Sequence, residues 1–150
     1  MSVTSTNITL VFTVIRNAMY PVEICVVFDP ENTTWYGYLL SDAVYLHSMV
    51  FSTQTYFDIQ SGRNPGILAW VHLSKTIKLL QERLAANKEH ESTSDSTILA
   101  VMTLAMAAAV TGEQEAAIHH MEGLYKVVDC RGGLEAFAGN NSMIQTKVCR

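Results

Sequence analysis

Hydrophobic residues recur every three or four positions along most of this chain, which is the spacing that places them on one face of an α-helix. The first regular stretch begins at Ser41 or Asp42, either of which can cap a helix, and it runs to about Ile59. We expect the buried face of this helix to consist of Ala43, Leu46, Val50 and Phe57.

The second predicted helix runs from about Ile67 to Lys88 and has the most regular apolar seam of the chain. It follows a loop that is marked by Gly62 and by Asn64-Pro65-Gly66. The seam steps alternately by three and four residues through Trp70, Leu73, Ile77, Leu80 and Leu84.

The third predicted helix, Ile98–Val110, is apolar on nearly every side. A polar linker over residues 87–95 precedes it, Asp95 or Ser96 can cap it, and Gly112 ends it. Because a helix without a polar face needs neighbours all around it, we place this one in the middle of the array.

A fourth helix is expected from about Glu113 to Arg131, and a fifth begins near Ser142. Gly132 and Gly133 follow the fourth helix and supply the positive φ of a helix C-cap, with Leu134 placed to cover that cap. The spacing puts four apolar residues of the fourth helix on one face: Ala117, Met121, Leu124 and Val128.

These elements predict an all-α fold, an antiparallel array of about four to five helices preceded by an irregular N-terminal segment over residues 1–34. Residues 35–150 would form one helical domain. The periodicity of residues 1–34 does not decide between strand and helix. We favour helix or irregular structure there, because the rest of the chain offers no strand partner.

The composition fits one globular domain, since 150 residues with 49% hydrophobic content can bury a sizeable core. Ten Lys and Arg stand against fourteen Asp and Glu, and this net charge of −4 argues against a self-sufficient DNA-binding surface. Cys25, Cys130 and Cys149 lack a Cys-x-x-Cys spacing, which favours reduced thiols. Neither a signal peptide nor a membrane span is predicted, because the apolar runs are too short or lack basic flanks.

No set of residues points to catalysis, to a cofactor or to a metal ion. His119 and His120 are neighbours on a helix and point about 100° apart, so they do not chelate one ion together. Arg131-Gly-Gly could cradle a phosphate through its backbone N–H groups, but these glycines follow a helix instead of preceding one, which favours the C-cap. A Cys130 nucleophile would need a histidine base that the sequence does not place beside it.

Two short runs carry a resemblance to a known family, His120-Met-Glu-Gly-Leu124 and Val128-Asp-Cys-Arg-Gly-Gly-Leu134. Together they resemble the His-x-x-Gly-Leu and Arg-Gly-Gly pattern in the regulatory domain of fungal-specific transcription factors. The matching residues are His120, Gly123, Leu124, Arg131, Gly132 and Gly133.

The resemblance covers about Trp35–Arg150. Trp35–Asp42 with Leu46–Phe51 looks like the segment that opens the first core helix of the family, Lys75–Leu84 is similar to its second helix, and Ser96–Gly112 to its third. The order and spacing of these pieces are more specific than any one of them.

The resemblance implies a transcription regulator of the nucleus that lacks its own DNA-binding motif. The binuclear zinc cluster of the family, built from six cysteines, has no counterpart here, and the family domain usually continues well beyond the match to Lys147–Arg150. We therefore expect a C-terminally truncated front part of the domain.

Such a part would act through a protein partner or self-association, and a small-molecule effector is a further option. No direct DNA binding, no membrane association and no enzymatic activity are expected of it. The alternative is a stand-alone helical protein–protein interaction module without a transcriptional role. An enzyme ranks behind both, because no nucleophile, base and orienting residue can be named together.

Overall fold

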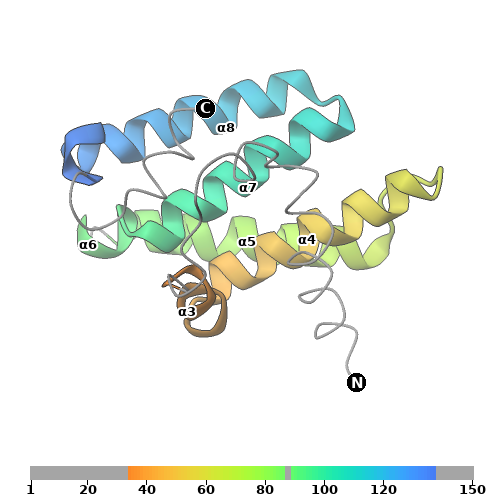
Figure 1. The fold of residues 1–150 in the computed structure, drawn as a ribbon, viewed down its shortest axis with the longest axis horizontal. Coiled ribbons are helices and arrows are strands. Elements are labelled where there is room, and N and C mark those ends of the chain that lie inside the picture. The colour runs from red at the N-terminus through yellow and green to blue at the C-terminus, as the bar shows by residue number, and fades with distance from the viewer. Residues whose placement is uncertain (1–33, 87–88, 138–150) are drawn as a thin grey trace, which may run out of the picture.

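Helices make up every regular element of residues 34–86 and 89–137, the part of the chain that the computed structural model describes (Figure 1). The predicted all-α fold is confirmed for this part. The predicted fifth helix, Cys25, Cys149 and almost all of the N-terminal segment lie outside it. The elements are α3 (Thr34–Ser41), α4 (Ala43–Gln60), α5 (Ile67–Ala85), α6 (Glu89–Ser92), α7 (Asp95–Thr111), α8 (Gln114–Cys130) and the 3₁₀ helix η3 (Leu134–Phe137).

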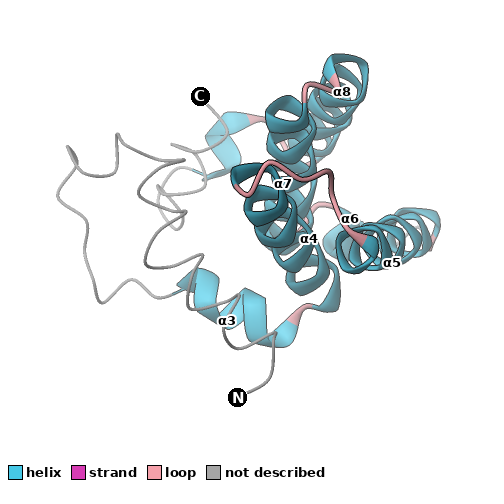
Figure 2. Ribbon diagram, turned by 90° about the vertical axis from the view of Figure 1, so that its right-hand side faces the viewer, coloured by secondary structure: helices cyan, strands magenta, loops and turns pink. Residues whose placement is uncertain are grey.

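Two helical hairpins, α4 with α5 and α7 with α8, pack through α4 and α7 (Figure 2). Within each hairpin the helices are antiparallel, as the short loops predicted. Across the hairpins α4 and α7 run parallel: Asp42 meets Ser96 at one end, and Met49 meets Thr103 seven residues further along both helices. The N-termini of both central helices therefore lie at the same end of the bundle.

The central helix α7 is buried on all sides along most of its length, as its sequence predicted. Every residue from Asp95 to Ala105 is buried, and its small alanines allow α4 and α8 to approach closely. Only the last turns emerge, where Ala109 and Val110 are exposed. No helix in the described residues is long and apolar enough to cross a membrane.

The predicted face of α4 is wrong in part. Ala43 is exposed, Leu46 and Phe57 are half-buried, and of the four predicted residues only Val50 is fully buried. The helix packs against α5 on one side and α7 on another, so its buried residues do not form a single stripe. The others are Val44, Tyr45, Ser48, Phe51, Thr53, Thr55 and Asp58.

The loop between α4 and α5 is organised by the carboxylate of Asp58, which is buried at the end of α4. It accepts hydrogen bonds from the backbone N–H of Gly66 at 2.9 Å and from the side chains of Gln54 and Arg63 at 3.3 Å each. The Gly66 bond is the main reason that the pKa of Asp58 lies below its ordinary value, in spite of burial. The predicted loop is present, and its geometry depends on this one acid.

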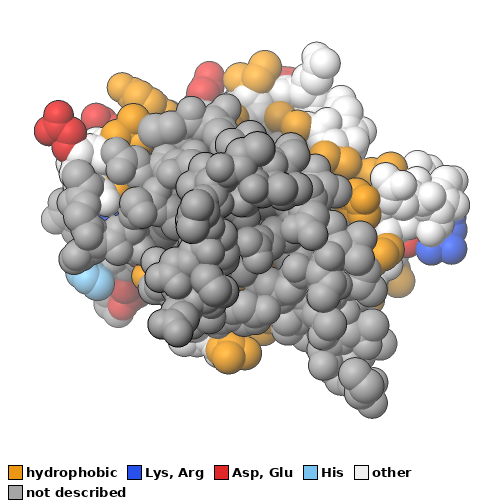
Figure 3. Space-filling view, viewed as in Figure 1, with side chains coloured by type: hydrophobic (Ala, Val, Ile, Leu, Met, Phe, Trp, Pro, Cys, Tyr) orange, Lys and Arg blue, Asp and Glu red, His pale blue; other side chains and the backbone are white. Residues whose placement is uncertain are grey.

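The predicted seams of the outer helices are also wrong in part. Five of their residues pack in the core: Leu73, Ile77 and Leu80 of α5, and Leu124 and Val128 of α8. Trp70 and Leu84 of α5 are exposed, and so is Met121 of α8. Because α5 packs mainly on α4, and α8 on α7, only a narrow strip of each outer helix is covered. Apolar side chains therefore reach the surface along the edge where α8 runs, and Figure 3 shows several of them there in orange.

Three short elements were not predicted at all. α3 precedes the expected start of the first helix and contributes the buried Leu39, α6 forms within the predicted linker, and η3 follows the glycine pair. Each is under three turns long, so its periodicity is too brief to be recognised in a sequence.

Candidate functional site at the convergent helix ends

Four helix ends meet at one end of the bundle, and each brings one charged side chain. Asp42 is the N-cap of α4 and Asp95 is the first residue of α7, whereas Arg83 lies in the last turn of α5 and Arg131 is the C-cap of α8. We refer to these four residues as the clasp. Acids at helix N-termini and bases at helix C-termini both complement the helix dipoles, so all four charges are favourably placed.

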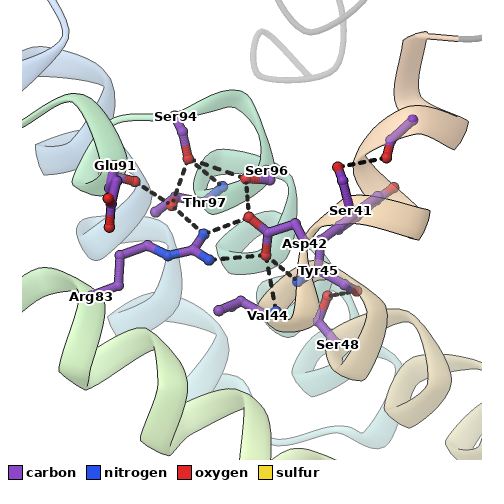
Figure 4. Close-up of polar contacts among 11 residues, drawn as sticks. Ser41, Asp42, Val44, Tyr45, Ser48, Arg83, Glu91, Ser94, Ser96 and Thr97 are labelled. Atoms are coloured by element: carbon purple, nitrogen blue, oxygen red, sulfur yellow. Dashed lines mark hydrogen bonds and ion pairs between the residues drawn. The ribbon is translucent and has the colours of Figure 1, made fainter.

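Asp42 forms the centre of one half of the clasp (Figure 4). Its carboxylate accepts the backbone N–H groups of Val44 and Tyr45 at 2.9 and 3.2 Å. Arg83 binds both of its oxygens, Nη1 to Oδ2 at 2.9 Å and Nη2 to Oδ1 at 3.0 Å, and the Ser96 hydroxyl donates at 2.6 Å. Burial raises the pKa of Asp42, but the bonds from Arg83, Ser96 and Tyr45 outweigh burial and hold it below its ordinary value.

The start of α7 is capped by Ser94, whereas Asp95 or Ser96 was predicted. The Ser94 hydroxyl accepts the backbone N–H of Thr97 at 3.3 Å. The two predicted caps instead bind across to other helices, Asp95 to Arg131 and Ser96 to Asp42. Asp95 and Ser96 therefore form tertiary contacts in place of local capping bonds.

Arg131 forms the second half of the clasp. It pairs with the carboxylate of Asp95 and donates to the backbone carbonyl of Thr93, and its guanidinium lies 4.5 Å from the ring centroid of Phe137. The Tyr38 hydroxyl also donates to Asp95, at 2.6 Å. This arginine thus joins α8 to α7 and to η3.

The glycine pair turns the chain directly after Arg131. Gly132 has a φ of +109° and Gly133 a φ of +76°. The N–H of Gly133 bonds to the carbonyl of Val128 and that of Gly132 to the carbonyl of Asp129, which is the hydrogen-bond pattern of a Schellman C-cap. The helix ends as a C-cap predicts, and the turn brings Phe137 back under Arg131.

The other residues of the family pattern lie along α8. Leu124 is fully buried, whereas His120 is half-buried and its pKa is lowered, first by burial and then by the charge of His119. Gly123 lies within the helix, and a Cβ added there would meet nothing within 4 Å. The roles of these residues as a family motif remain a prediction.

A second polar contact joins α4 and α5 through two histidines. The Nδ1 atoms of His47 and His72 lie 2.9 Å apart, so one ring donates and the other accepts. Burial and then nearby positive charge lower the pKa of both imidazoles. Cys130 is exposed at the end of α8, and its thiol has no hydrogen bond with either ring. Among the described residues, no three histidine, cysteine or acidic side chains group as metal ligands would.

The clasp was not recognised in the sequence as a site. Asp42 and Asp95 stood out only as caps, and Arg83 and Tyr38 not at all. An acid at a helix start and an arginine at a helix end are visible signals, but their partners are 41 and 36 residues away. Only the packing of the helices pairs them.

Comparison with known proteins finds one similarity of note. A phomenoic acid biosynthesis cluster-specific transcriptional regulator of Leptosphaeria maculans is 31% identical over 80 residues, or 53% of this chain. The same segment spans 15% of that regulator's length, so the chain corresponds to a small part of it. No family model and no solved structure matches. The chain is thus distantly related to a fungal transcriptional regulator.

Breaking the clasp should destabilise the bundle. Arg131→Gln removes the ion pair to the carboxylate of Asp95, which is 9% exposed, and we expect a loss of about 1–3 kcal/mol in urea unfolding. Arg63→Gln is the control: the Arg63 side chain is 67% exposed, so its loss should change stability by about 0.5 kcal/mol or less. Equal losses for the two variants would contradict a special role for Arg131.

Two glycines of the family pattern should respond oppositely to alanine. Gly132→Ala forces a Cβ onto a backbone at φ +109° and should cost about 1 kcal/mol or more. Gly123→Ala fills open space within a helix and should stabilise by about 0.5–1 kcal/mol. We expect Gly133→Ala to fall closer to neutral, since its φ of +76° lies nearer to the left-handed helical region. Unfolding midpoints that move the same way for Gly123 and Gly132 would contradict this account.

The histidine pair should make the fold sensitive to mild acid. Because the folded-state pKa of both rings lies below the ordinary 6.5, the unfolded chain takes up protons first, so stability falls as the pH drops below about 6.5. Between pH 7.5 and 5, the double variant His47→Gln with His72→Gln should lose less stability than the unaltered chain. His90→Gln, at an exposed position, should behave like the unaltered chain. The same pH dependence in all three would refute the pair as its source.

Proposed function

We propose that this chain is a regulatory, middle-homology-type module of a fungal transcription factor, which acts through contacts with other proteins. Its body would be the helical domain of residues 35–150. The observation that carries the proposal is the Arg131-Gly-Gly turn, where the family pattern coincides with the Asp95 pairing that joins the helix ends. The relation to a transcriptional regulator supports the same class of function.

The charges of the described residues speak against DNA binding by this module. The arginines of this part of the chain, Arg63, Arg83 and Arg131, each pair with an aspartate. Their guanidinium groups are therefore occupied, and a phosphate would have to compete with a carboxylate for each of them. The module would rely on another part or partner to reach DNA.

A stand-alone protein interaction module is the second candidate. The observation that favours it is the exposed apolar surface of α8, which would serve a partner equally well without any transcriptional role. The two candidates differ in whether contact with the partner changes transcription.

A tethering experiment separates them. Fused to an unrelated DNA-binding domain, the chain should change the output of a reporter that carries the site of that domain. The variant Arg131→Gln should lose this effect if it unfolds the clasp, and Arg63→Gln should keep it. If the fusion and the DNA-binding domain alone give the same reporter output, the regulatory proposal is wrong and the stand-alone interaction module is the remaining candidate.

The chain alone should not recognise DNA. In a mobility-shift assay near physiological salt, we expect no sequence-dependent complex with a dissociation constant below about 1 μM, because the chain carries a net charge of −4 and the arginines of its described part pair with aspartates. Sequence-dependent binding tighter than this would overturn the proposal that the module relies on another part or partner to reach DNA.

A further inference from the structure

The outer side of α8 carries an apolar groove of about 330 Å³. Its floor is formed by the buried Leu124 and Val128, and its sides by Met121, Tyr125 and Leu134. Leu134 belongs to η3, which the glycine turn folds back towards α8. The groove thus exists because the chain reverses at Gly132 and Gly133.

Exposed apolar side chains extend this groove along the helix. Ile118, Met121 and Tyr125 are spaced by three and four residues, and they are 58%, 49% and 72% exposed. That spacing aligns them as one stripe over about two turns of α8. Single exposed apolar residues are ordinary, but an aligned stripe that ends in a groove is typical of a surface that binds another chain.

A row of acids borders the stripe on one side. Glu115, Glu122 and Asp129 repeat every seven residues, and all three are exposed. Glu122 and Asp129 each lie four residues after a stripe residue, which places them about 40° around the helix from it. Figure 3 shows acidic side chains in red beside hydrophobic ones in orange along the edge that α8 occupies. In the described part of the chain, none of the three forms an ion pair, although Lys126 lies four residues after Glu122 on the same helix.

We infer that this groove binds an amphipathic helix of another protein whose apolar stripe is bordered by Lys or Arg. A helical occupant fits because Ile118–Val128 is about 15 Å long, which is the length of three turns of a partner helix. Basic flanks fit because the acids along the stripe form no ion pair within residues 34–86 and 89–137. The inference deepens the proposed function, on which it rests, by naming the chemistry of the partner.

A second copy of this chain is the weaker occupant. In a two-fold symmetric antiparallel pair, the row of Glu115, Glu122 and Asp129 would face the same row of the other copy. The chain also carries a net charge of −4, so two copies repel each other at long range. Both effects favour a basic partner over self-association.

Two synthetic helical peptides test the inference on the purified chain. They share one apolar stripe and differ only at its flanks, which are Lys in one and Glu in the other. By fluorescence anisotropy the Lys peptide should bind about tenfold tighter, the equivalent of two or three exposed ion pairs. The preference should shrink as salt is added.

Charge reversal in the acid row beside the stripe is the decisive experiment. Glu122→Lys should remove most of the preference for the Lys peptide, whereas Glu82→Lys, the same change at an exposed site on α5, should leave it intact. Tyr125→Ser should weaken both peptides alike. Equal binding of the two peptides would show that the acids beside the stripe contribute nothing, and equal effects of the two reversals would show that only general charge attraction is present. Either result would overturn the inference.

Analytical ultracentrifugation tests whether a second copy of the chain occupies the groove. If the unaltered chain is a dimer and Tyr125→Ser makes it a monomer, a second copy fills the groove and the inference is wrong. Peptide binding is measured without any promoter, so its failure leaves the tethering result untouched. A reporter effect that survives Tyr125→Ser would likewise locate the regulatory contact elsewhere.

Discussion

The clasp of Asp42, Arg83, Asp95 and Arg131 is the constraint on which the rest of the structure depends. Because the central helices α4 and α7 run parallel, their two positive N-terminal dipole ends lie side by side. The aspartates offset that charge, and the arginines from the C-terminal ends of α5 and α8 neutralise the aspartates in turn. The pairs thereby hold four helix ends in one arrangement.

The clasp also links the family pattern to the surface beside it. Arg131 is held by Asp95 and stacks over Phe137, so the glycine turn between them has a defined direction. That direction places Leu134 against α8 and creates one side of the groove. The Arg131-Gly-Gly turn therefore has a structural role and also shapes the groove to which we assign partner binding. A substitution that disrupts the turn should also weaken partner binding.

The two hairpins differ in the polar contacts that they carry in addition to the clasp. In the first hairpin, His47 and His72 meet between the helices, and Asp58 holds the loop. In the second hairpin, the apolar stripe of α8 is exposed to solvent. The two outer helices thus differ in character, because α5 is joined to its neighbour by a titratable pair while α8 presents an apolar, acid-bordered face to solvent.

The sequence by itself determined the four long helices α4, α5, α7 and α8, their approximate ends and the central position of α7, because periodicity and glycine stops act over a few residues. Gly112 and Gly132 end their helices through local backbone geometry, which neighbouring residues specify. The buried faces of α4 and α5, the true cap Ser94 and the partners of Arg83 and Arg131 were decided only by the tertiary structure. The physical reason is that a side chain able to cap its own helix can equally bind a distant charge, and only the packing of α4 against α7 brings that charge within reach.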